Sequence, residues 1–137
     1  MNAALRRYLV AYLAALVVFL VIDSLWLGVI AADFYQERLG PFMTGPVVVP
    51  AAVAFYLLYI VGVVVFAIAP ALEIGAWKTA ARRGALLGLI AYATFDLTNL
   101  AILPGWPLSV ALVDMVWGAA LTGTTATLGY LITRRLS

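Results

Sequence analysis

The chain has 137 residues, of which 66% are hydrophobic and only 10% are charged, and its mean hydropathy is +1.12. A soluble domain carries about 25% charged residues, so this chain lacks the polar groups to cover a water-facing surface and must use lipid as its solvent. The net charge of +2 comes from basic residues that form no stripe or groove, which excludes a nucleic-acid-binding protein.

The residue types that build most cofactor sites are missing. The absence of Cys and His excludes disulfides, thiolate nucleophiles and the usual zinc and haem sites. The only lysine, Lys78, lies in a polar connection, so no buried lysine can form a Schiff base. We therefore expect no bound cofactor, and the sequence assigns neither catalytic nor metal-binding residues.

Four apolar stretches are long enough to cross a bilayer as helices, which takes about 20 residues. They predict spans over residues 8–30, 47–69, 84–103 and 108–132 of a single integral membrane domain, 1–137. Since the stretches lack period-2 alternation, they do not indicate membrane β-strands. We predict an all-α membrane protein, a four-transmembrane-helix bundle in antiparallel up-down order. The first stretch exceeds the 7–15-residue apolar core of a signal peptide, so we expect it to be retained.

Polar connections separate the predicted spans. The segment 33–45 holds three aromatic residues expected at headgroup depth on a short interfacial helix: Phe34, Tyr35 and Phe42. A polar link is expected over 70–83. The run Pro104-Gly105-Trp106-Pro107 cannot stay helical, so the third and fourth spans must be antiparallel neighbours.

Basic residues predict the orientation of the bundle. With four crossings, Arg38 alone falls on one side. The other seven fall together on the opposite side: Arg6, Arg7, Lys78, Arg82, Arg83, Arg134 and Arg135. Cytoplasmic ends of membrane helices carry the excess of Lys and Arg, so we expect a multi-pass protein with both termini cytoplasmic.

Three of the six acidic residues, Asp23, Asp96 and Asp114, fall inside predicted spans. An ionised Asp at a helix centre costs about 2.5–3.5 kcal/mol on insertion scales, so such residues face the bundle interior and mark candidate sites. Counting about 1.5 Å per residue places all three roughly 9–12 Å below the outer boundary. The sequence therefore predicts that three helices place a carboxyl group at one level.

Each acid has a companion three residues further on, on the same helix face. The companions are Trp26, Asn99 and Trp117, and Tyr92 extends the face of the third span. No Lys, Arg or His lies inside a span, so a proton, a cation or hydrogen-bond donors must neutralise the carboxylates. The competing structural interpretation is that the acids are neutral or hydrogen-bonded and only join the helices.

Small residues predict close helix packing. Gly84 and Gly88 form a small-xxx-small pair, and one flank of the fourth span is nearly bare: Gly118, Ala119, Thr122, Gly123 and Thr127. In lipid, such residues let helix backbones approach closely. We expect them to pack within the chain, and the alternative is a homo-oligomer face or a surface for a membrane partner subunit.

The segments VIDSLWLGVIAADFY, AYATFDLTNLA and LPGWPLSVALVDMVWG resemble the bacterial family of predicted membrane proteins called domain of unknown function 2177 (DUF2177). The likeness covers nearly the whole chain, and it implies a four-helix protein of the bacterial inner membrane whose family has no assigned activity. It also implies an association with genes for fatty-acyl chain modification. The family pattern matches eight residues without giving them a role: Asp23, Trp26, Asp96, Thr98, Asn99, Trp106, Asp114 and Trp117.

Three functional hypotheses follow. We favour an outward-side acidic pocket that binds a cation, a proton or a small ligand; if such a short chain also transports it, a homodimer is expected. The second is a membrane enzyme or accessory protein of lipid or fatty-acyl metabolism that uses paired carboxylates. The third is a structural subunit of a larger membrane complex. Because no metal motif and no histidine are present, binding is favoured over catalysis.

Overall fold

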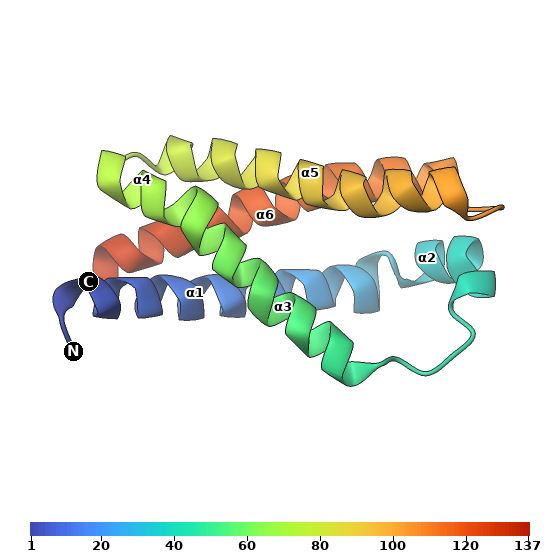
Figure 1. Ribbon diagram of the computed structural model, residues 1–137, viewed down its shortest axis with the longest axis horizontal. Coiled ribbons are helices and arrows are strands. Elements are labelled where there is room, and N and C mark those ends of the chain that lie inside the picture. Colours follow the sequence, from blue (N-terminus) through green and yellow to red (C-terminus); the bar gives the residue numbers. More distant parts are fainter.

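The computed structural model describes residues 1–137 as helices joined by short connections, with no β-strand. Four helical segments are long and apolar enough to cross a membrane: Ala3–Ile30, Val49–Ile74, Trp77–Ile102 and Leu108–Leu136. Successive segments run in opposite directions, so that both termini lie at the same end of the bundle (Figure 1). The predicted four-helix membrane architecture is thus confirmed.

Two of the four segments contain a π-helical turn. The first consists of α1 (Ala3–Leu25) followed by the turn η1 (Trp26–Ile30). The second consists of α3 (Val49–Val63), the turn η3 (Val64–Ile68) and α4 (Ala69–Ile74). A π-turn adds one residue to the helix and changes the direction in which the following side chains point.

The remaining elements complete the bundle. The short helix α2 (Ala32–Leu39) and the 3-10 turn η2 (Gly40–Phe42) lie at the end opposite the termini, as Figure 1 shows. The third and fourth segments are the single helices α5 (Trp77–Ile102) and α6 (Leu108–Leu136). These two helices form the most extensive contact in the structure, and α1 packs against α6 next to them.

The turn between α5 and α6 has the expected form. Gly105 adopts a positive φ of 88°, which a residue with a side chain rarely tolerates. The backbone N–H of Trp106 donates to the carbonyl of Leu103 over 3.1 Å. This tight reversal makes α5 and α6 antiparallel neighbours, as the sequence predicted.

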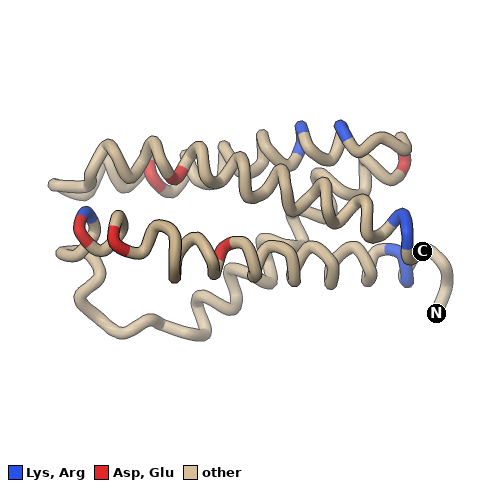
Figure 2. Tube along the Cα trace, turned by 180° about the vertical axis from the view of Figure 1, so that it is seen from behind, with Lys and Arg blue, Asp and Glu red and all other residues tan.

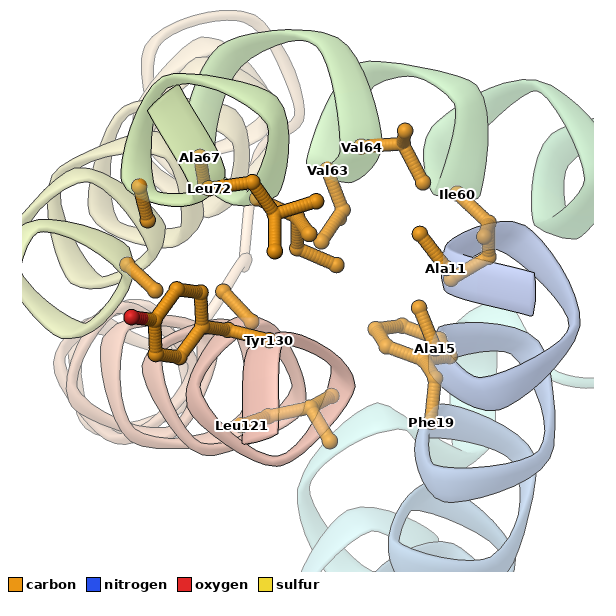
Figure 3. Packing of buried hydrophobic residues seen from close by; sticks show 14 residues of the cluster. Ala11, Ala15, Phe19, Ile60, Val63, Val64, Ala67, Leu72, Leu121 and Tyr130 are labelled. Carbon is orange, nitrogen blue, oxygen red and sulfur yellow. The ribbon is translucent and has the colours of Figure 1, made fainter. Parts of the chain in front are cut away.

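A cluster of buried apolar residues joins α1, α3, η3, α4, α5 and α6 around fully buried side chains such as Phe19, Ile60 and Leu121 (Figure 3). The outer faces are apolar as well. Val17, Leu58 and Val116 are 59%, 73% and 72% exposed, where a soluble protein would need polar groups. The bundle is therefore apolar inside and outside, as lipid requires.

Basic residues gather at the end that carries both termini, as Figure 2 shows. We call this the arginine-rich end, defined by Arg6, Arg7, Lys78, Arg82, Arg83, Arg134 and Arg135. Arg38 lies in α2 at the opposite end.

Each helical segment extends past one end of its predicted span, although the second begins only at Val49. The polar link predicted over 70–83 is wrong. The connection there consists only of Gly75, with a φ of 81°, and Ala76. Pro70 does not end the second segment, because it directly follows the π-turn η3, and such a local adjustment satisfies the backbone groups that a proline frees in a membrane helix. Charged residues such as Arg82 and Arg83 lie within α5, since a charged side chain does not interrupt backbone hydrogen bonding.

Candidate acidic pocket

Two of the three intramembrane acids line one cavity of about 440 Å³. Asp23 stands near the end of α1 and Asp114 in the second turn of α6, and they are 6% and 8% exposed. The other polar and aromatic walls come from α2, α3, α5 and α6: Tyr35, Phe55, Tyr56, Tyr92, Phe95 and Trp117. The cavity contains no basic side chain among its lining residues.

Asp23 receives hydrogen bonds from two different helices. The hydroxyl of Tyr56 on α3 donates to its Oδ2 over 2.9 Å. The indole N–H of Trp117 on α6 approaches its Oδ1 at 3.4 Å, which is long for a hydrogen bond. Asp23 therefore connects α1 to α3 firmly and to α6 more weakly.

Asp114 is bound by a residue from the connection between the first two membrane segments. The hydroxyl of Tyr35 on α2 donates to its Oδ1, and the indole of Trp26 donates to the same hydroxyl over 3.0 Å. Burial, and then the hydrogen bond to Asp114, raise the pKa of Tyr35. Tyr35 therefore remains a donor at neutral pH and connects η1 to α6 through α2.

Each of the two tryptophans is directed toward the acid on the other helix and not toward the acid three residues before it in the chain. Trp26 was predicted as the companion of Asp23, and Trp117 as the companion of Asp114. In the structure Trp117 donates to Asp23, whereas Trp26 reaches Asp114 only through Tyr35. Their rings stack with centroids 4.2 Å apart and planes inclined by 10°. The π-turn that begins at Trp26 changes the direction of this ring, which spacing along an ideal helix could not anticipate.

Asp96 on α5 lies beside Asp114 and Trp106 but outside the cavity wall. It is fully buried, and neither of its carboxyl oxygens accepts a hydrogen bond; the nearby Trp106 Nε1 also has no partner. Two carboxylates this close repel one another unless a proton or a cation lies between them. The three predicted acids thus meet in pairs, with Asp114 between Asp23 and Asp96.

Two further predicted residues behave differently from each other. Tyr92 lines the cavity, and its ring lies against Gly118 of α6, where any side chain would overlap it. Asn99 is half-buried, forms no side-chain hydrogen bond and does not line the cavity. Asn99 is therefore not part of the cavity wall in which it was predicted.

Thr94 bonds back to the carbonyl of Ile90 over 2.7 Å, as membrane hydroxyls commonly do.

The comparison with known families agrees with the membrane architecture. The family model described as "Predicted membrane protein (DUF2177)" matches residues 8–131. The chain belongs to this family. No curated protein and no solved structure matches the chain significantly.

In this DUF2177 protein the acids are not arranged as a single metal centre. No three acidic side chains lie close enough together to hold one metal ion, although divalent cations such as Mg²⁺ depend on several oxygen ligands at once. The one salt bridge of the structure, between Arg38 and Glu37 at 3.8 Å, is on the surface. Asp23 and Asp114 therefore have aromatic donors as partners, Asp96 has none, and no basic residue pairs with any of the three.

Tyr35 of this DUF2177 protein was not predicted from the sequence to bind one of the intramembrane acids. It was placed at headgroup depth with Phe34 and Phe42, but it is buried and reaches Asp114. A signal for this was present, because Tyr35 and Leu39 of α2 and Ala31 just before it recur at a spacing of four, which puts them on one face. That face packs toward Trp106 and Val110.

Proposed function

We propose that this membrane protein binds a small organic cation, with apolar groups beside its charge, in the cavity between Asp23 and Asp114. One observation carries the proposal: two nearly buried carboxyl groups line a cavity of about 440 Å³ that has no basic lining residue. A buried carboxylate is costly unless it is paired. The hydrogen bonds from Tyr56, Trp117 and Tyr35 spread the charge of the carboxylates but supply no opposite charge.

The walls of the cavity support an organic cation rather than a bare ion. Aromatic faces attract cations through their quadrupole and are used to recognise quaternary ammonium groups. Six aromatic side chains surround the two acids, and ten of the twelve lining residues are hydrophobic. The volume falls in the range of about 300–1,000 Å³ that small-molecule sites occupy.

The pair of Asp96 and Asp114 adds a role for protons. A cation beside Asp114 and a proton between Asp114 and Asp96 would compensate the same negative charge, so the two compete. Low pH should therefore weaken cation binding. Asp96 is not in the cavity wall, and we expect it to act through Asp114.

The proposal includes an orientation. The arginine-rich end would face the cytoplasm of a bacterial cell by the positive-inside rule. The cavity, whose acids lie toward the other end of α1, α5 and α6, would then be in the outer half of the inner membrane.

Equilibrium binding of tetraphenylphosphonium to the purified chain in neutral detergent tests the proposal. Tetraphenylborate, an anion of nearly the same shape, serves as the ligand control. Asp23→Asn and Asp114→Asn should each weaken tetraphenylphosphonium binding about tenfold or more, since each loses one charge contact in a low-dielectric site. Glu37→Gln removes an exposed acid outside the cavity and should leave binding unchanged. Equal binding of the two probes, or full binding by both Asn variants, would overturn the proposal.

A further inference from the structure

A second cavity, of about 700 Å³, lies at the arginine-rich end, where the connection between α4 and α5 meets the last turns of α6. We infer that this cavity binds the phosphate group of an anionic phospholipid. The inference is independent of the acidic pocket, which belongs to the opposite half of the bundle and attracts the opposite charge.

Three basic side chains line this cavity, namely Lys78, Arg134 and Arg135, and no acidic residue does. None of the three forms a salt bridge, because the structure's one ion pair joins Arg38 to Glu37. Three cations from two helices that face one space without a counter-ion repel each other, and a phosphate between them removes that repulsion.

The position of one arginine is fixed before any ligand arrives. The Nη1 of Arg134 donates to the hydroxyl of Tyr130 over 2.7 Å. The same nitrogen lies 3.9 Å from the position of a Cβ on Gly75, so Arg134 lies beside the connection between α4 and α5. A guanidinium held in place loses less conformational entropy when it binds a phosphate.

The surroundings indicate that the phosphate belongs to a lipid. Trp77, which lines the cavity, is 50% exposed, as is usual for tryptophan at the headgroup level of a bilayer. Leu131 in the wall and Ile74 next to Gly75 are 46% and 66% exposed. Leu131 and Ile74 thus offer exposed apolar surface for acyl chains at the same end as the basic groups. Basic pockets between membrane helices recognise anionic headgroups in this way.

Lipid titrations of the full chain in neutral detergent at physiological salt test the inference. Dioleoyl phosphatidylglycerol is the anionic probe and dioleoyl phosphatidylcholine the zwitterionic one. Inorganic phosphate and glycerol 3-phosphate represent a soluble source of the same group. Native mass spectrometry and the melting temperature report binding. We expect the anionic lipid alone to bind and to raise the melting temperature.

Matched variants locate the binding site. Lys78→Gln with Arg135→Gln removes two charges from the cavity wall, and neither side chain forms a hydrogen bond in the fold. Arg82→Gln with Arg83→Gln removes two exposed charges from the same end outside the cavity. The first pair should weaken phosphatidylglycerol binding about 20-fold, and the second less than about twofold because distant exposed charges are screened.

Three results would overturn the inference. Equal losses in both double variants would mean attraction to the whole basic end and no specific cavity. Equal binding of phosphatidylcholine would remove the role of charge. Equal binding of glycerol 3-phosphate would make the ligand a soluble phosphate. Arg134→Lys keeps the charge but loses the fixed guanidinium, and it should bind the lipid more weakly than the wild type while melting at a similar temperature in its absence.

Discussion

Gly88 and Gly118 bring the backbones of α5 and α6 into direct contact. A methyl group on Gly88 would overlap the carbonyl oxygen of Gly118, and Gly84 is similarly close to Thr122 and Ala126. Helices in lipid associate largely through such close packing of small residues. The positions of Asp96 and Asp114, one on each helix, therefore depend on these glycines.

Gly88→Ala should destabilise the folded bundle by about 1–3 kcal/mol, the usual cost of overpacking. Gly62→Ala is the matched control, because the nearest atom to its added methyl group lies 4.0 Å away. The control should be neutral or slightly stabilising, since alanine favours a helix by up to about 1 kcal/mol over glycine. Thermal unfolding followed by circular dichroism in detergent measures both, and equal melting temperatures would contradict the prediction.

Tyr35→Phe should destabilise the protein by about 1–3 kcal/mol. The change removes the hydroxyl that links the Trp26 indole to Asp114, and it leaves the buried Asp114 Oδ1 and the half-buried indole N–H without a partner. Tyr8→Phe, at a residue that is 42% exposed and forms no side-chain hydrogen bond, should have almost no effect. A Tyr35 variant as stable as the Tyr8 variant would show that the link contributes nothing.

The contribution of Tyr35 to the free energy of unfolding should decrease at alkaline pH. Burial and the hydrogen bond to Asp114 raise the pKa of Tyr35 above its ordinary value of about 10. The folded chain thus retains a proton that the unfolded chain releases. The contribution is complete below about pH 10 and decreases as the pH rises further. In melting experiments from pH 8 to 11, the difference between wild type and Tyr35→Phe should narrow above about pH 10; a constant difference would contradict this.

Asp96→Asn should stabilise the protein. The amide has nearly the same shape as the carboxyl group but can donate to Asp114, which removes a buried and unpartnered acid. The expected gain is roughly 1–3 kcal/mol, measured as a higher melting temperature at neutral pH. Glu73→Gln changes an exposed acid and should stay within about 0.5 kcal/mol of the wild type. A loss of stability in Asp96→Asn would mean that the carboxylate is needed for the fold.

Single cysteines test the orientation, because the chain has none of its own. Gln36→Cys on exposed α2 and Ser137→Cys at the C-terminus lie at opposite ends of the bundle. In spheroplasts, a membrane-impermeant maleimide should label position 36 directly and position 137 only after permeabilisation. The reverse pattern would contradict cytoplasmic termini.

The membrane fold was predictable because composition leaves few alternatives. In lipid every backbone polar group must be satisfied within the chain, so long apolar segments become helices. The errors concern helix ends. Pro70 appeared to end the second segment, but the π-turn η3 admits it into a continuous helix. Hydropathy also predicted that the third span begins at Gly84, whereas α5 begins at Trp77.

The sequence predicts one depth for the three acids from the rise per residue of a helix, and in the structure Asp114 lies near both Asp23 and Asp96. Which donor binds which acid was not predictable. This depends on how each helix is rotated about its axis, and η1 turns Trp26 toward Tyr35. Asn99 shows the same limit, because its face of α5 does not point into the cavity. The inward direction of Tyr35 depends on how α2 folds back over the bundle, which spacing alone does not specify.

The two walls of the acidic cavity are packed with different tightness. One wall belongs to α5 and α6, whose touching backbones leave no freedom to separate. The facing wall carries Phe55 and Tyr56 on α3, which crosses the bundle at an angle and rests mainly on α1 (Figure 1). In the proposed function, a shift of α3 alone would therefore let the cavity bind ligands of different sizes, while Asp114 keeps its place on α6.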